Sequence, residues 1–304
     1  MKKIWIFLWI VCCALYSSCS LLEVEPVSTI TSQSFWKNSG DAKAYLTGIY
    51  NKVRALNNTS LYGEDRGDAF KVGEIGPSTN AWAQNLLENN APSYRDAYNI
   101  IHHTNLLLYK IDGLSFTNEA DKNRIKAETY YLRAQTYFFL VRIWGDAPIL
   151  LDPVLSDKIE LKPRSPKEEV MKQVLSDIEQ SLSLFPEEGF VNKNYSSKPA
   201  AYALKADALL WKAKVLNGGD SDLNEAVNAI NEVEKSGVEL LPEYASVFNN
   251  ANKRNAEIIF SLYFERYETG NLSIATNTTS RTDNLSMAVN LDEAATSPNQ
   301  SRHV

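Results

Sequence analysis

The residues that suit acid–base or metal chemistry are few in this sequence, and their spacing does not suit that chemistry. Adjacent acids occur at Glu168-Glu169 and Glu187-Glu188, whereas a glycosidase needs two carboxylates that face each other across a cleft. Acids at a helix start or in a loop do not predict that geometry. The histidines His102, His103 and His303 match no HExxH motif and no other metal-ligand spacing. The sequence therefore predicts no catalytic constellation, no metal site and no cofactor.

The cysteines all precede residue 20, and Cys19 has the setting of an acylation site. Lys2-Lys3 is followed by an apolar run, Ile4–Leu15, that is shorter than the roughly 20 residues of a transmembrane helix. Small residues then lead to Cys19 in an order that resembles a bacterial lipobox. We therefore expect residues 1–18 to be a lipoprotein signal peptide. An ordinary secretory signal with a chance cysteine is the alternative, because Tyr16 stands where a lipobox usually carries leucine.

Processing at this position has consequences for stability, attachment and charge. The mature chain would hold only the acylated Cys19, so its core must be stable without disulfides. A lipobox cysteine carries several acyl chains, such as palmitate, which is enough for firm membrane anchoring. The formal net charge of −6 would fall to about −8 without Lys2 and Lys3, and this spread negative charge argues against a nucleic-acid partner.

Hydrophobic periodicity predicts that the bulk of the chain is helical. Residues 57–80 are rich in Gly, Asn and Ser and are expected to form a long loop of the kind that often carries function. The segment Glu257–Phe264 is β-prone and is expected to be a lone strand. Helices are expected over residues 41–54, 94–111, 121–144, 165–185, 199–216 and 222–237.

Two stretches repeat the same helix–turn–helix outline. Each pairs a helix rich in alanine and aromatic residues with an amphipathic one, over Lys122–Leu184 and over Pro199–Gly237. Small residues beside large aromatic ones let two helices approach closely. The pattern is typical of tetratricopeptide-like repeats without a strict period, and a generic helical bundle is the alternative. The predicted fold class is mainly α, with helical hairpin repeats, long loops and little β-structure.

Start signals and apolar stripes give more detailed expectations for these helices. Ser165 is expected to be an N-cap, with Pro166 at the first helical position and Glu168 completing a capping box. The apolar stripes and aromatic positions predict which side chains are buried in four helices. The expected buried residues are Ala127, Tyr131, Ala134, Tyr137, Phe138, Val141, Trp144, Val174, Ile178, Leu182, Phe185, Trp211, Val227, Ile230 and Val233.

Four segments, in this order, resemble the SusD/RagB family of nutrient-binding lipoproteins. Glu128–Ile149 is similar to the family's most recognisable stretch, a helix that ends in an aromatic-Gly-Asp-x-Pro turn. Lys198–Leu216 resembles the alanine-rich helix of the family. Leu240–Phe248 and Asn255–Ser261 resemble the segments that follow it. With the lipobox in front, the likeness extends from Cys19 to about residue 270.

The chain is shorter than members of that family, which carry a further C-terminal part. We therefore expect residues 19–40 to be a lipidated N-terminus and tether, and residues 41–268 to be the helical repeat domain. Residues 269–304 are polar and irregular, and we expect them to be the start of a truncated C-terminal part.

The resemblance implies a function in nutrient uptake. It implies a lipid-anchored, surface-exposed protein of the outer membrane that binds an oligosaccharide, or sometimes a peptide, and is not an enzyme. The implied partner is a SusC-like TonB-dependent transporter, which receives the nutrient. A helical-repeat scaffold that binds another envelope protein, a glycan-degrading enzyme and a non-functional truncated remnant are the alternatives.

The resemblance also places the ligand site in the long loop that follows the first helix. Sugar recognition uses aromatic rings that stack on the apolar faces of pyranoses, together with polar side chains that bond the hydroxyls. Trp82 is the expected stacking residue, with Asn80, Asn85, Arg66 and Asp68 as hydrogen-bonding partners. The structural alternative is that Trp82 anchors the loop and that Arg66 and Asp68 form a local ion pair.

Overall fold

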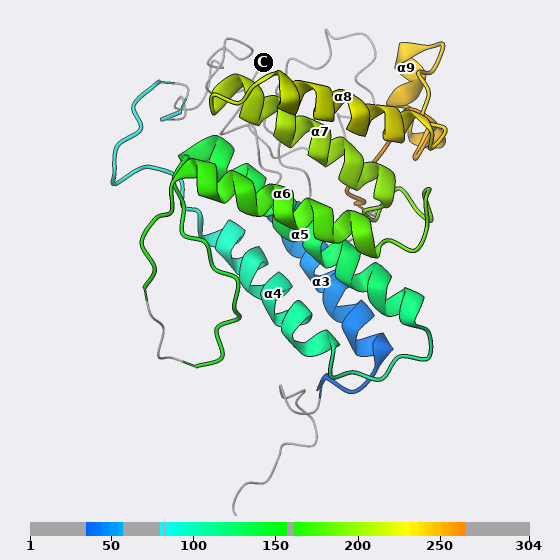
Figure 1. The fold of residues 1–304 in the computed structure, drawn as a ribbon, viewed down its shortest axis with the longest axis horizontal. Coiled ribbons are helices and arrows are strands. Elements are labelled where there is room, and N and C mark those ends of the chain that lie inside the picture. The colour runs from blue at the N-terminus through cyan, green and yellow to red at the C-terminus, as the bar shows by residue number, and fades with distance from the viewer. Residues whose placement is uncertain (1–34, 57–79, 82, 157–160, 265–304) are drawn as a thin grey trace, which may run out of the picture. The chain divides into compact units, whose positions relative to one another are not determined.

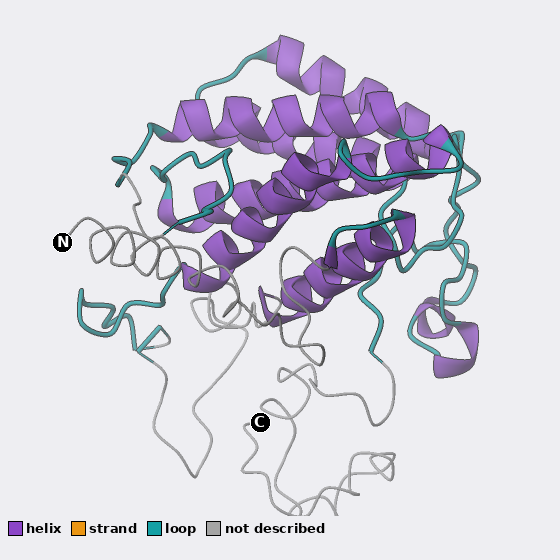
Figure 2. Ribbon diagram, turned by 90° about the horizontal axis from the view of Figure 1, so that it is seen from below, coloured by secondary structure: helices purple, strands orange, loops and turns teal. Residues whose placement is uncertain are grey.

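A computed structural model describes residues 35–56, 80–81, 83–156 and 161–264. The chain divides into two compact units, residues 1–37 and 38–304, and every described helix lies in the second. The described part contains helices and loops but no strand (Figure 2), so the mainly α fold class is confirmed. The helices are α3 (Ser39–Leu56), α4 (Arg95–Ile111), α5 (Glu119–Trp144), α6 (Lys167–Leu184), α7 (Lys198–Val215), α8 (Asp220–Glu234), the single turn α9 (Tyr244–Val247) and the 3-10 helix η4 (Asn250–Asn252).

Consecutive helices pack side by side through this unit. Figure 1 shows α3 and α4 at the bottom of the view, α5 and α6 in the middle and α7 and α8 at the top. The most extensive contacts join α5 to α6 and α7 to α8. These two pairs are the helical hairpins that the sequence predicts, and α6 also packs on α7 to join them.

Helix α5 is the central element, because it contacts α3, α4, α6 and α7. Its expected face is confirmed, with Ala127, Tyr131 and Phe138 all at most 4% exposed. Burial continues around the helix, so polar residues are enclosed as well. The hydroxyls of Thr129 and Thr136 donate to the carbonyls one turn back, at 2.6 Å each, which satisfies them inside the helix. Tyr137 is also buried as expected, whereas Trp144 and Trp211 are half-buried at the edges of the core.

The start of α6 differs from the expected capping box. Ser165 is paired with Ala147 through two main-chain hydrogen bonds of 3.1 Å, so its backbone is held in a bridge rather than at the N-cap. Pro166 occupies the N-cap and makes no side-chain cap. The carboxylate of Asp146 instead accepts the Lys167 N–H at 2.9 Å. The Gly-Asp-x-Pro turn after α5 therefore caps α6. Beyond this turn, the buried stripe of α6 is confirmed.

Helix α8 is rotated relative to the expected orientation. Val233 is buried, but Val227 and Ile230 are 59% and 43% exposed, so their expected burial is wrong. The buried stripe contains Ala226 and Ala229, which pack against Ala206 and Leu209 of α7. Small residues at the contact allow α7 and α8 to approach closely, and this packing turns the larger side chains outward.

The strand expected over Glu257–Phe264 does not form. In these residues the main chain makes one long-range hydrogen bond, from the Ser261 N–H to the Lys193 carbonyl at 2.9 Å. A strand needs a ladder of such bonds with a neighbour, and no described segment provides one. The β-prone side chains serve tertiary packing instead, as in the edge-to-face contact of Phe260 with Tyr131.

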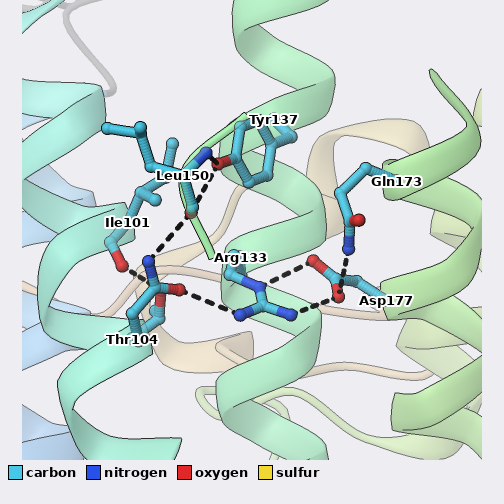
Figure 3. A network of polar contacts seen from close by, with 8 residues as sticks. Ile101, Thr104, Arg133, Tyr137, Leu150, Gln173 and Asp177 are labelled. Atoms are coloured by element: carbon cyan, nitrogen blue, oxygen red, sulfur yellow. Dashed lines mark hydrogen bonds and ion pairs between the residues drawn. The ribbon is translucent and has the colours of Figure 1, made fainter. Parts of the chain in front are cut away.

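A buried ion pair joins α5 to α6. Arg133 donates two hydrogen bonds to Asp177, at 2.8 and 2.6 Å, and both residues are at most 6% exposed. Gln173 donates to the same carboxylate at 2.9 Å (Figure 3). Arg133 donates a third hydrogen bond to the side-chain carbonyl of Asn105 in α4, at 2.9 Å. Burial raises the pKa of Asp177 and the guanidinium partly offsets this rise, so the pair holds three helices together at a desolvation cost.

The same network fixes the chain that leaves α5. Tyr137 Oη donates to the Leu150 carbonyl and accepts from the Leu150 N–H, both at 2.8 Å (Figure 3). The Asn105 amide also donates to the Leu150 carbonyl, at 2.9 Å. Tyr98 of α4 donates to the Pro148 carbonyl at 2.8 Å. The loop after α5 is therefore attached to both α4 and α5.

Replacement of one partner of the buried pair should be severely destabilising. We expect Arg133→Met to lower the free energy of unfolding by about 3–5 kcal/mol, because the Asp177 carboxylate is left buried without its counter-charge. Urea denaturation followed by circular dichroism measures the change. Lys172→Met removes an exposed ion pair with Glu169 and should cost less than about 1 kcal/mol. Equal losses for the two variants would contradict the role assigned to Arg133.

Candidate ligand-binding site

The predicted loop site is described only in part. Asn80 and Asn85 are exposed and belong to one turn, in which the Asn85 N–H donates to the Asn80 carbonyl at 2.9 Å. Ala81, between them, is 2% exposed and anchors this turn. Trp82, Arg66, Asp68 and the predicted lipidation residue Cys19 lie outside the described residues. The structure thus brings the two asparagines together at the surface, and the other assignments stay predictions.

Residues 85–90 of this loop are held by local side-chain bonds. Asn90 accepts the Leu87 N–H at 2.6 Å, and its amide donates to the Asn85 carbonyl at 2.9 Å. Leu86 and Leu87 are 36% and 55% exposed. The loop therefore presents both amide groups and apolar side chains from a backbone that local bonds hold in place.

An aromatic cluster joins this loop to the helices. Tyr94 is 50% exposed and makes edge-to-face contacts with two rings. Its ring centroid lies 5.9 Å from that of Trp144 and 5.4 Å from that of Tyr98. Trp144 ends α5 and also contacts Phe139. Trp144 was expected in the core, and no role was predicted for the ring of Tyr94. Both rings instead lie where the loop meets the start of α4 and the end of α5.

A separate cavity lies between α3, the start of α5 and the loop that precedes α7. Its volume is about 470 Å³. This cavity was not predicted from the sequence, because its residues come from segments that are far apart in the chain. Its polar lining includes Ser39, Lys43, Thr47, Asp121, Arg124, Glu128, Glu187, Asn192, Tyr195 and Ser196.

Glu128 is the buried polar group of this cavity. Its Oε2 accepts a hydrogen bond from Tyr50 at 2.7 Å, and the residue is 6% exposed. The Tyr50 hydroxyl also lies 3.0 Å from Ser196 Oγ and accepts the Ser196 N–H at 2.8 Å. Tyr50 therefore connects α3, α5 and the segment before α7 at a single oxygen.

The cavity wall beside Glu128 is a charged cluster. Arg124 donates through two nitrogens to the carboxylate of Glu187, and through a third to Asp121 at 2.9 Å. These bonds hold the pKa of Arg124 above its usual value. Burial raises the pKa of Glu128 to about 7, although Tyr50, Arg124 and Lys43 favour its ionised form.

Other kinds of site are not found in the described part of the chain. No group of three or more His, Cys, Asp or Glu side chains there is placed to hold a metal ion. None of the described helices is both long and apolar enough to cross a membrane.

The raised pKa of Glu128 predicts a specific pH dependence of stability. The folded state holds this proton up to about pH 7, whereas the unfolded chain releases it near 4.5. The free energy of unfolding should therefore fall by about 3 kcal/mol between these pH values, relative to Glu128→Gln. Urea denaturation of both proteins from pH 4 to pH 8 measures the difference. The exposed Glu243→Gln variant should parallel the wild type, and a wild type that gains stability over Glu128→Gln with rising pH would contradict the prediction.

Comparison with known proteins identifies the family. Residues 22–210 match the model of the SusD-like family, which is described as starch-binding and associating with the outer membrane. A SusD-like protein of Formosa agariphila is 28% identical over 286 residues, which cover 86% of this chain and 51% of the relative. The chain spans about half the length of the curated relatives it matches.

Solved structures support the same assignment. B. fragilis NanU superposes with a TM-score of 0.74 at 27% identity, over 87% of this chain and 56% of its own. A SusD superfamily protein of Bacteroides vulgatus superposes with a TM-score of 0.71 at 30% identity, over 82% of this chain and 54% of its own. The family match extends from before α3 into α7 and includes the loop of Asn80 and Asn85. The chain therefore belongs to the SusD-like family.

Proposed function

We propose that this protein captures an oligosaccharide at the outer membrane, to which it is attached by lipid at Cys19, and passes it to a SusC-like TonB-dependent transporter. The observation that carries this proposal is the family match over residues 22–210. The loop that the family resemblance marks for ligand binding lies within that match.

The described part of the loop suits glycan capture. Asn80 and Asn85 offer amide groups at the surface, and their turn is anchored through the buried Ala81. A loop positioned by a rigid scaffold loses less conformational entropy when it binds. We place Trp82 at the stacking position of this site, with Arg66 and Asp68 as further hydrogen-bonding residues. An aromatic ring between polar side chains matches a sugar ring, which has apolar faces and a polar rim.

Trp82→Ala should remove most of the glycan affinity while the fold is retained. Loss of a stacked aromatic surface should weaken binding at least tenfold, because stacking and the burial of apolar area are lost together. Isothermal titration calorimetry against malto-oligosaccharides and other soluble glycan fragments measures the change. Tyr109→Ala is a matched control, since Tyr109 is 59% exposed near the opposite end of α4 from the loop.

The alternatives give different results in the same titrations. A scaffold protein would bind none of the glycans, and its interaction with another envelope protein would survive Trp82→Ala. A glycan-degrading enzyme would release reducing ends during the titration. Either outcome would contradict the capture function.

Cys19→Ser tests the lipid anchor and the partner. The wild-type protein should partition into the membrane fraction with acyl groups on Cys19, and the variant should be released. Affinity purification from the native membrane, followed by mass spectrometry, should recover a TonB-dependent transporter with the wild type. A membrane-bound Cys19→Ser protein would exclude the anchor, and a purified wild type without a transporter would exclude the delivery step.

A further inference from the structure

The cavity above Glu128 has the size of a small-molecule site. Its volume of about 470 Å³ falls within the range of about 300–1,000 Å³ that is typical of ligand pockets. Three separate segments build it: the first half of α3, the first third of α5 and the chain between α6 and α7. Because these segments are bonded to one another through Tyr50, the cavity is formed before any ligand arrives.

One acceptor at the floor of the cavity is left without a partner. Glu128 Oε2 is bonded to Tyr50, but Oε1 has no hydrogen bond within the described part of the chain. Glu128 lines the cavity, and only 6% of its surface is exposed to solvent. Oε1 is not among the fully buried side-chain atoms of the described residues that lack a partner, so it is accessible from the cavity. A ligand hydroxyl that enters the cavity could donate a hydrogen bond to it.

The charges around Glu128 select against an anionic ligand. Asp121 and Glu187 also line the cavity, and the guanidinium of Arg124 is already bonded to both. Lys43, on the exposed face of α3, is the remaining cation of the lining. A second carboxylate or a phosphate would be placed near three acids, whereas an uncharged hydroxyl donor meets no repulsion.

The other walls offer the two surfaces that a sugar ring requires. Leu46, Ile125 and Phe116 provide apolar contact, and Thr47 and Asn192 provide polar groups. Thr47, Asn192 and Tyr195 also line a second hollow of about 740 Å³, so the two hollows adjoin at these residues. Tyr195 is 40% exposed and its ring is held edge-to-face on Tyr50 at 5.2 Å. An aromatic ring therefore stands at the junction, where a chain of sugars would pass.

We propose that this cavity is a second glycan site, which binds one uncharged sugar ring through a hydroxyl that donates to Glu128 Oε1, with further units of the chain passing over Tyr195. The glycan class rests on the proposed function, but the site is distinct from the loop of Asn80 and Asn85. Glu128 lies about 24 Å along α5 from Trp144, which contacts the end of that loop, at a rise of about 1.5 Å per residue.

The carboxyl carbon of Glu128 is a direct reporter of this site. In ¹³C NMR of the full chain, its signal should titrate near pH 7 and be absent in Glu128→Gln. A bound hydroxyl stabilises the ionised form, so saturation with sugar should move the midpoint to lower pH. The charged and titratable groups around the Glu128 carboxyl are Tyr50 and Lys43 of α3, Arg124 and Asp121 of α5 and Glu187 after α6. The probes are D-glucose, D-galactose, D-mannose, N-acetyl-D-glucosamine and maltotriose, each added singly.

A variant that fills the cavity gives the matched test. Gly189 lines the cavity, and a Cβ added there meets no atom within 4 Å, so Gly189→Trp can start a large side chain at the cavity wall. Gly219→Trp is the control, because Gly219 is equally open but precedes α8, which lines neither hollow. We expect Gly189→Trp and Glu128→Gln to weaken binding of the responding sugar at least tenfold at this site, while Gly219→Trp and Trp82→Ala leave it unchanged.

The outcomes separate this site from the proposed function. If a glycan binds and Trp82→Ala abolishes all binding while the Glu128 signal never moves, the cavity proposal is overturned and the loop function stands. If the Glu128 signal responds in the wild type and in Trp82→Ala, the cavity proposal holds. The loop assignment then fails only if Trp82→Ala also leaves the total glycan affinity measured by calorimetry unchanged. A response that survives Gly189→Trp overturns the cavity proposal as well. If none of the probes moves the signal, the cavity proposal fails whatever calorimetry shows of glycan binding elsewhere.

Discussion

The ion pair between Arg133 and Asp177 is the constraint around which the rest of this fold is organised. Helix α5 is enclosed on nearly all sides, so a charge in its middle must find its partners inside the protein. Arg133 finds them on both neighbours, in Asp177 of α6 and Asn105 of α4. An apolar core would tolerate a sliding or rotated α5, whereas this set of bonds is satisfied in one register only. Each of the three helices is thereby fixed along its length.

A fixed α5 also determines what lies at its two ends. At its C-terminal end, Trp144 contacts Tyr94, and Asp146 just beyond caps α6, so the exposed loop and the next hairpin take their positions from the same turn. At its N-terminal end, Arg124 and Glu128 face the chain between α6 and α7. One helix therefore serves both the loop that the family resemblance marks and the cavity above Glu128.

Features that depend on one helix could be predicted from the sequence, whereas features that depend on contacts between distant segments could not. The stripe of Val174 and Ile178 and the helical hairpins were predictable, because they follow from periodicity along one helix. The rotation of α8 was not, since the choice between Ala226 and Val227 as the inward residue depends on how closely α7 approaches. The β-prone segment near Phe260 failed as a strand because no neighbouring strand exists in the described chain. The cavity was beyond sequence reasoning, as Tyr50 and Glu128 are 78 residues apart.

The position of Glu128 shows why a stability argument alone does not explain this structure. A glutamine or an apolar residue at this place would avoid the desolvation that raises the pKa of the carboxyl to about 7. Arg133 and Asp177, by contrast, partly offset the cost of each other's burial through two direct bonds. Among the described residues, the buried acids Asp177 and Glu128 thus differ in kind: Asp177 accepts from protein donors on both oxygens, and Glu128 on one. A group that the protein leaves half satisfied at the floor of a preformed cavity is suited to a donor supplied from outside, and this asymmetry distinguishes a binding residue from a structural one.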